Sequence, residues 1–130
     1  MIVGIGIDLV LVSRVRKLAE RFPERIGHKV FTAAELVYCL AKADPAISLA
    51  GRFAAKEALM KALGTGWGSG VRFIDIEIIR APSGQPSVAL SGRASEIAHA
   101  RGITDWHVSI THDGDFAMAM VIAESRTPQV

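Results

Sequence analysis

The apolar positions of this chain fall into strand-like and helix-like stretches. The strand-like stretches, rich in β-branched and aromatic residues, cover residues 2–10, 73–79, 87–90, 106–111 and 116–124. The helix-like stretches cover residues 14–22, 32–43, 45–63 and 91–101. Because helices and strands come in blocks rather than in strict alternation, the order βαααββαββ predicts an α+β fold, in which an antiparallel sheet packs with helices.

Short sequence signals mark where the predicted helices begin and end. Ser13 offers an N-cap to the first helix, and Pro23 closes it. Thr32 and Glu35 have the capping-box spacing that starts the second helix. The remaining boundary signals are Pro45, the stop at 64–66 and Gly102.

The first strand is predicted to be buried, and its two faces differ. One face is entirely apolar, whereas the other carries Gly4, Gly6 and Asp8. Glycines weaken a strand, so their presence indicates that something approaches the backbone there. A buried, unpaired Asp8 carboxylate would cost roughly several kcal/mol unless it met a cation or hydrogen-bond donors. It could cap a helix N-terminus, or it could bind a hard metal ion such as Mg²⁺.

The charges of the helix at 45–63 do not follow its apolar stripe. Arg52 and Lys56 fall on the arc that should be buried, while Glu57 and Lys61 lie on an arc of small alanines. Glu57 could simply pair with Lys61, an interaction worth about 0.2–0.5 kcal/mol. Alternatively, Glu57 meets the aspartate of the first strand in a sparse Mg²⁺ site, and the three cations serve a diphosphate.

Two further features have both an ordinary and a functional interpretation. The glycine-rich stretch at 64–70 could be only a helix stop and a turn, or its N–H groups could approach a phosphate; it lacks the Walker ending. His112 stands at the edge of an Asp-Gly hairpin, where it could be a polar turn residue or a catalyst. The alternating residues before it place Ser109 and Thr111 on one face. No nucleophile setting or zinc-ligand spacing accompanies it, so covalent catalysis and zinc chemistry are disfavoured.

Composition narrows the classes of protein. A chain of 130 residues fits one domain, here 1–124 with a tail at 125–130. Without an apolar run near the roughly 20 residues of a membrane helix, and without a leader pattern, we expect a soluble cytoplasmic protein with no membrane partner. The formal charge of +2 is too small to predict nucleic-acid binding but suits an acidic partner. Cys39 is the single cysteine, which excludes an internal disulfide; we expect it to be buried.

Several motifs in order along the chain resemble holo-acyl-carrier-protein synthases, the short bacterial type of 4′-phosphopantetheinyl transferase. These motifs are Gly-Ile-Asp-Leu-Val at 6–10, Phe-Thr-Ala-Ala-Glu-Leu at 31–36, Arg-Phe-Ala-Ala-Lys-Glu-Ala at 52–58 with Lys61, Gly-Thr-Gly at 64–66, and Val-Ser-Ile-Thr-His at 108–112. The resemblance implies a single transferase-like domain that assembles as a homotrimer with active sites at the subunit interfaces. It also implies Mg²⁺ as cofactor, coenzyme A as donor and apo acyl carrier protein as acceptor, with adenosine 3′,5′-bisphosphate released.

The same resemblance implies roles for individual residues. Asp8 and Glu57 would bind Mg²⁺ and Lys61 a phosphate, and with His112 they form the predicted catalytic set. The proton acceptor is left open between a water on the metal, Glu57 and His112. The further contacts implied for coenzyme A are Arg52, Gly64, Thr65, Gly66, Pro86 and His112. The predicted docking residues for the acidic carrier protein, in the most basic segment, are Arg14, Arg21 and Arg25.

Two rival functions remain to be weighed. One is a trimeric module, not an enzyme, that binds a nucleotide or an acidic protein through the same basic helix; such a module has no need for Asp8 and Glu57 together. The other is a related domain of a fatty-acid synthase multienzyme, which the Met1 start and single-domain length disfavour. The chain departs from the commonest family pattern at Leu11, where an acidic residue is frequent, and at Thr111, where serine is frequent.

Overall fold

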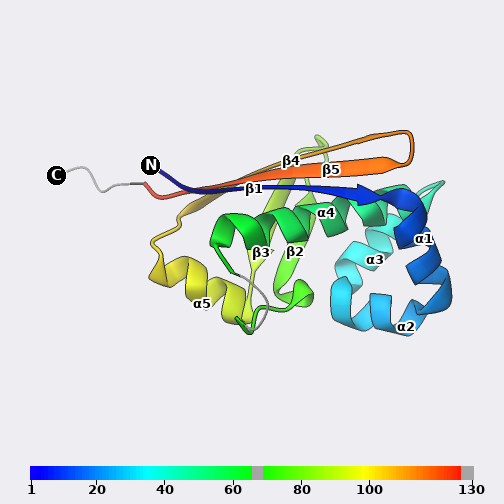
Figure 1. The fold of residues 1–130 in the computed structure, drawn as a ribbon, viewed down its shortest axis with the longest axis horizontal. Coiled ribbons are helices and arrows are strands. Elements are labelled where there is room, and N and C mark those ends of the chain that lie inside the picture. The colour runs from blue at the N-terminus through cyan, green and yellow to red at the C-terminus, as the bar shows by residue number, and fades with distance from the viewer. Residues whose placement is uncertain (66–68, 127–130) are drawn as a thin grey trace.

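Two antiparallel sheets flank a long central helix (Figure 1). The computed structural model describes residues 1–65 and 69–126. Its larger sheet has the order β1-β5-β4, and the strands are β1 (Ile2–Leu11), β4 (Asp105–Asp113) and β5 (Phe116–Glu124). The smaller sheet pairs β2 (Ile76–Arg80) with β3 (Pro86–Leu90). The predicted α+β class and the antiparallel pairing are therefore confirmed.

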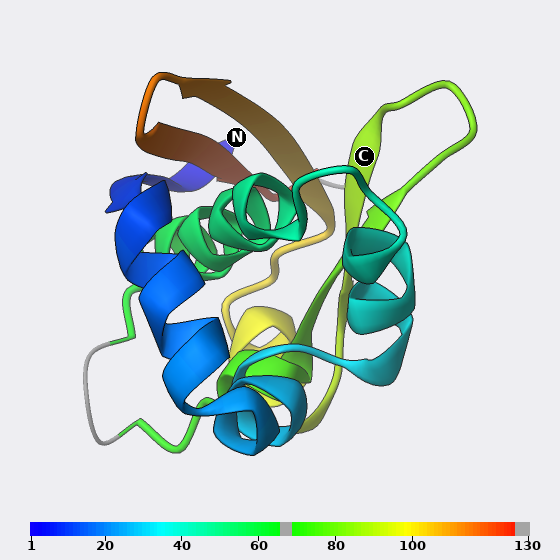
Figure 2. The same ribbon diagram turned by 90° about the vertical axis from the view of Figure 1, so that its right-hand side faces the viewer.

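Helix α4, Pro45–Leu63, runs under the inner face of the larger sheet, with the β2–β3 hairpin on its other side (Figure 2). It is buried nearly all round, which explains why its charges do not follow one stripe. The other helices are α1 (Val12–Arg21), α2 (Pro23–Arg25), α3 (Ala33–Leu40) and α5 (Gly92–Ala100), with a π-helical turn at Ile26–Val30 and a 3-10 turn at Phe73–Asp75. None of the helices in 1–65 and 69–126 is both long and apolar enough to cross a bilayer.

The glycines of β1 bring this strand against α4. A β-carbon on Gly4 would overlap the carbonyl of Ala62, and one on Gly6 would overlap the carbonyl of Ala58. The sequence predicted a close approach to the backbone here, and the group that approaches is the helix itself.

The predicted start of the first helix is wrong because a distant residue acts on it. The N-cap of α1 is Leu11, and Ser13 lies in the first turn, where its N–H donates to the Asp115 carboxylate at 2.9 Å. Asp115 thus takes the capping role expected of Ser13, from the other end of the chain. The first helix ends before Pro23 as predicted, and Pro23 then begins the short helix α2.

The remaining boundaries differ less from the sequence. The capping box of Thr32 and Glu35 is confirmed, although α3 ends at Leu40 and so is shorter than predicted. The strand expected from residue 73 starts only at Ile76, after the 3-10 turn. In the predicted tail, the Ser125 N–H donates to the Met1 carbonyl at 2.8 Å, and residues 127–130 lie outside the described part.

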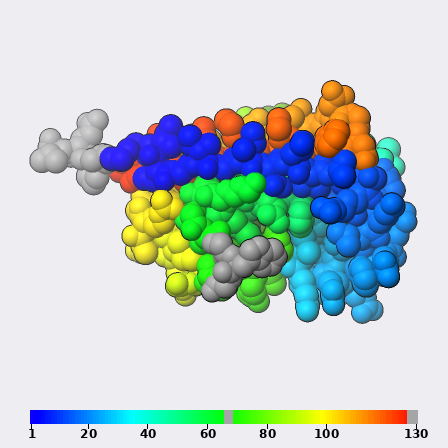
Figure 3. All heavy atoms as spheres, in the orientation of Figure 1, coloured from blue at the N-terminus to red at the C-terminus, as the bar shows by residue number. Residues whose placement is uncertain are grey.

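The larger sheet turns an apolar face to the outside, so the prediction that the first strand is buried is wrong for half of its residues. Ile5, Ile7 and Leu9 are 60%, 53% and 59% exposed. Figure 3 shows β1, in dark blue, lying on the surface along the length of the molecule. We call this surface the outer sheet face; it consists of Ile5, Ile7, Leu9, Leu11, Phe116, Met118 and Met120, which share one side through the β1–β5 register. By contrast, Cys39 is buried as predicted.

Candidate active site

Three of the predicted catalytic residues meet along the seam between β1 and α4. Asp8 points toward the helix because it pairs with buried Ala119 on β5. Glu57 and Lys61 lie one turn apart on the facing helix. The Lys61 ammonium is 3.1 Å from Asp8 Oδ1 and donates to the Ile7 carbonyl at 2.9 Å. Lys61 therefore pairs with the strand carboxylate rather than with Glu57 in the described structure.

The two carboxylates carry more negative charge than Lys61 can balance. Burial raises the pKa of Glu57, the charge of Asp8 raises it further, and Lys61 acts in the opposite direction. Within residues 1–65 and 69–126, no group of three or more His, Cys, Asp or Glu side chains gathers as a metal cluster. A pair of carboxylates with excess charge fits Mg²⁺, which takes oxygen ligands and keeps positions open for substrate phosphates.

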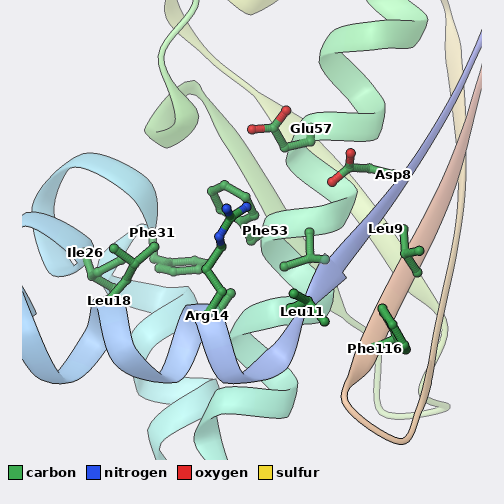
Figure 4. A pocket seen from close by; sticks show the side chains of 12 residues that line it. Asp8, Leu9, Leu11, Arg14, Leu18, Ile26, Phe31, Phe53, Glu57 and Phe116 are labelled. Carbon is green, nitrogen blue, oxygen red and sulfur yellow. The ribbon is translucent and has the colours of Figure 1, made fainter.

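A cavity of about 620 Å³ opens beside this carboxylate pair. Figure 4 shows Asp8 and Glu57 at one end of the cavity and the apolar side chains of Leu18 and Phe31 at the other. Arg14 of α1 also lines it. The first predicted docking residue thus shares a cavity with the predicted metal ligands.

A second, smaller cavity of about 150 Å³ holds Arg52 and His112 together. Arg52 is 2% exposed, lies 4.1 Å from the centre of the Tyr38 ring, and its Nε has no hydrogen-bond partner among the described residues. Lys42 and Arg80 line the same cavity, so it is strongly cationic and fits an anionic group. The sequence did not single out these last two residues. They are 10 and 28 residues from Arg52, so no short-range pattern links them to it.

The two cavities share no lining residue, so one chain does not bring Arg52 and His112 to the carboxylate pair. Pro86 stands opposite Arg80 in the β2–β3 register, on the side of the smaller cavity. Gly64 and Thr65 lie at the far end of α4, and Gly66 falls outside the described residues. The residues predicted to contact coenzyme A therefore form separate groups on one subunit.

Lys56 lines neither of these two cavities, and its contacts among the described residues show that the prediction of a cation for a diphosphate is wrong for it. Its side chain is fully buried and forms an ion pair with Glu35 Oε1 at 2.7 Å. It also donates to the backbone carbonyls of Phe73, at 2.9 Å, and Ile76. Burial lowers the pKa of the Lys56 ammonium, and the charge of Glu35 opposes this effect. All three ammonium protons have partners inside the protein.

The predicted docking residues present a mixed basic and apolar surface. Arg14 and Arg21 lie on α1, whereas Arg25 lies on α2 rather than on the first helix. The guanidinium groups of Arg21 and Arg25 lie 5.4 and 5.5 Å from the centre of the Phe22 ring. Leu18 and Phe22 are half-exposed along a shallow groove that Arg14 and Arg21 also line. Sequence reasoning named only the arginines, although an aromatic residue within a basic helix was a visible signal for the apolar part.

Comparison with known proteins gives a consistent answer. Residues 4–121 match the family model of the 4′-phosphopantetheinyl transferase superfamily. A holo-[acyl-carrier-protein] synthase of Desulforudis audaxviator is 49% identical over 123 residues, which cover 95% of this chain and 93% of the relative.

Solved structures agree in fold. Holo-[acyl-carrier-protein] synthase of Neisseria meningitidis superposes with a TM-score of 0.86 at 34% identity, covering 96% of this chain and 100% of that one. The Helicobacter pylori synthase, whose crystal structure is a complex with coenzyme A, has a TM-score of 0.81 at 37% identity and covers 92% of this chain and 99% of that one.

Proposed function

This chain belongs to the holo-[acyl-carrier-protein] synthase family of the 4′-phosphopantetheinyl transferases, and we propose that it transfers phosphopantetheine to acyl carrier protein. The reaction we propose depends on Mg²⁺ and takes place in the cytoplasm. The phosphopantetheine arm of coenzyme A goes to a serine of apo acyl carrier protein, and adenosine 3′,5′-bisphosphate is released. The observation that carries the proposal is the carboxylate pair, Asp8 and Glu57, in a cavity bordered by the basic helix α1. A binding module would not need two facing carboxylates, which disfavours the non-enzymatic rival.

The reaction forms a bond between the serine oxygen and the pantetheine-side phosphorus, and breaks the bond to the leaving phosphate. Asp8 and Glu57 would hold Mg²⁺, which when bound neutralises charge on the diphosphate. The Lys61 side chain is 54% exposed, so its ammonium can turn from Asp8 to a phosphate oxygen. The serine proton passes to a carboxylate oxygen of Glu57 or to the imidazole of His112.

Mass spectrometry of apo acyl carrier protein tests this function directly. After incubation with coenzyme A, Mg²⁺ and this protein, the carrier should gain one phosphopantetheine unit. A carrier whose acceptor serine is replaced by alanine should gain nothing. An unchanged mass for the intact carrier, with active folded protein present, would contradict the proposed transfer.

We further propose that the chain assembles as a homotrimer through the outer sheet face. Seven apolar side chains on one exposed surface are typical of a protein contact rather than of a free monomer surface. Assembly also accounts for the separation of the two cavities, because the cationic cavity with Arg52 and His112 would complete the carboxylate cavity of a neighbouring subunit.

Met120→Lys is expected to break this assembly. A lysine in the middle of the outer sheet face would lose its hydration when the subunits associate, which would cost roughly several kcal/mol. Light scattering should then report a single 13.9 kDa chain instead of three copies, and transfer should fall with it. Val37→Lys is the matched control, since Val37 is an exposed apolar residue on α3, away from this face. A wild-type protein that is monomeric at micromolar concentration would rule out the trimer.

Arg14→Glu is expected to weaken use of the carrier protein and leave coenzyme A binding unchanged. Reversing one charge at the border of the larger cavity should raise the KM for an acidic carrier about tenfold. Steady-state kinetics with each substrate varied in turn measure both values. Arg16→Glu, with the same charge change on the same helix, is the control, because Arg16 already pairs with Asp44 at 2.8 Å. An unaltered KM for the carrier in Arg14→Glu would count against docking on α1.

A further inference from the structure

The last four carbonyl groups of α4 all accept hydrogen bonds. The last carbonyls of a helix have no partner within the helix. Here the Met60 carbonyl accepts from the Thr65 N–H at 3.1 Å, and the Lys61 carbonyl accepts from the Gly64 N–H at 3.1 Å. The two remaining carbonyls, of Ala62 and Leu63, both accept from Nη1 of a single residue, Arg101.

Arg101 joins three elements that are distant in sequence. Its backbone N–H bonds the Ile97 carbonyl and caps α5, while its Nη2 donates to the Val3 carbonyl of β1 at 3.1 Å. Gly64 makes room for this arrangement. Its φ of +77° favours glycine, and a β-carbon there would lie only 3.2 Å from Arg101 Nη1. The guanidinium and the first residue after the helix are therefore fitted to each other.

The charge of Arg101 matters because of what the C-terminus of a helix does to anions. The aligned peptide dipoles leave about half a negative charge at this end, which would repel a phosphate. Lys61 lies in the last turn, but its ammonium is engaged with Asp8 in the described structure. Arg101 is the second cation at this helix end, and it both offsets the dipole and fixes the backbone at Gly64 and Thr65.

We propose that Arg101 is a positioning residue for coenzyme A binding. It touches none of the reacting groups; it holds Gly64 and Thr65 in the conformation that accepts the anionic donor and removes the electrostatic penalty of the helix end. This inference rests on the proposed function and on the coenzyme A contacts that the family resemblance implies for Gly64 and Thr65.

Arg101→Met tests the proposal through binding as well as turnover. The KM for coenzyme A should rise about tenfold while kcat stays within about twofold. The affinity for adenosine 3′,5′-bisphosphate, measured by isothermal titration calorimetry, should fall by the same factor. Arg101→Lys should recover part of the affinity, because it restores the charge but not the planar fork. Arg126→Met is the control, since it removes a surface arginine that pairs with Asp105.

Unchanged KM and product affinity in Arg101→Met, with or without lower thermal stability, would overturn the proposal. So would a fall in kcat alone. If that variant does not fold, Gly64→Ala tests the same fit with Arg101 in place, and it too should raise the KM for coenzyme A; an unchanged KM there would overturn the proposal. These failures differ from a failure of the proposed function, in which the wild-type protein itself would transfer nothing.

Discussion

Glu57→Gln should lower the rate of phosphopantetheine transfer by about two to three orders of magnitude, and Asp8→Ala should do the same. Each substitution removes one of the two negative charges that would hold Mg²⁺, while Glu57→Gln keeps the size of the side chain. The rate of holo-carrier formation, followed by mass spectrometry, measures the loss. Mg²⁺ binding, measured by titration calorimetry in the presence of coenzyme A, should weaken in parallel. If both variants kept most of the wild-type transfer rate, the proposed metal site would be refuted.

Glu57→Gln should not lower the stability of the folded protein. The folded-state pKa of Glu57 is raised, so the folded protein disfavours the ionised form that exists at neutral pH. Ionisation of Glu57 therefore costs stability as pH rises through its raised pKa, and this cost is absent at lower pH, where the group is protonated. Replacing it with neutral glutamine should leave the melting temperature at pH 7 equal or slightly higher. A clear decrease would show that Glu57 has a structural role as well.

Lys56→Met should cost about 3–5 kcal/mol in the free energy of unfolding. The substitution leaves the Glu35 carboxylate buried without its cation, and leaves the carbonyls of Phe73 and Ile76 without a donor. Urea unfolding followed by circular dichroism measures the change. The double variant Lys56→Met/Glu35→Gln should be less destabilised than the sum of the two single variants, because no unpaired buried charge remains.

An exposed lysine provides the control for this experiment. Lys17→Met, on the exposed side of α1, should change the free energy of unfolding by no more than about 0.5 kcal/mol. If Lys56→Met were equally mild, Lys56 would not be the clamp between α4 and the segment around β2 that its contacts indicate.

Short-range signals in the sequence predicted much of this fold correctly. The capping box at Thr32 depends on residues three positions apart, and the hairpin between β4 and β5 depends on adjacent ones. The errors have partners far away in the chain. Asp115 rather than Ser13 caps the first helix, and Lys56 forms an ion pair with Glu35 on another helix. No periodicity within a window of residues shows such a partner.

The candidate site was predictable for a different reason. A carboxylate in an apolar strand, like Asp8, needs compensation wherever the strand packs, so its need for a partner is visible without the fold. What the sequence could not show is where the apolar side of that strand goes. An alternating strand has the same pattern whether its face is covered by a helix or by another subunit, so Ile7 and Leu9 were predicted to be buried within the chain.

The glycines of β1 have a consequence for how this site tolerates change. Gly4 and Gly6 are in contact with the backbone of α4, and Asp8 follows two residues later on the same side of the strand. The distance between the two carboxylates is therefore set by how closely the backbones of β1 and α4 approach each other. If a larger residue at Gly4 or Gly6 pushed the strand outward, no rotamer of Asp8 or Glu57 could fully restore that distance. Gly4 and Gly6, which lie outside the carboxylate pair, thus set the spacing of the proposed metal site.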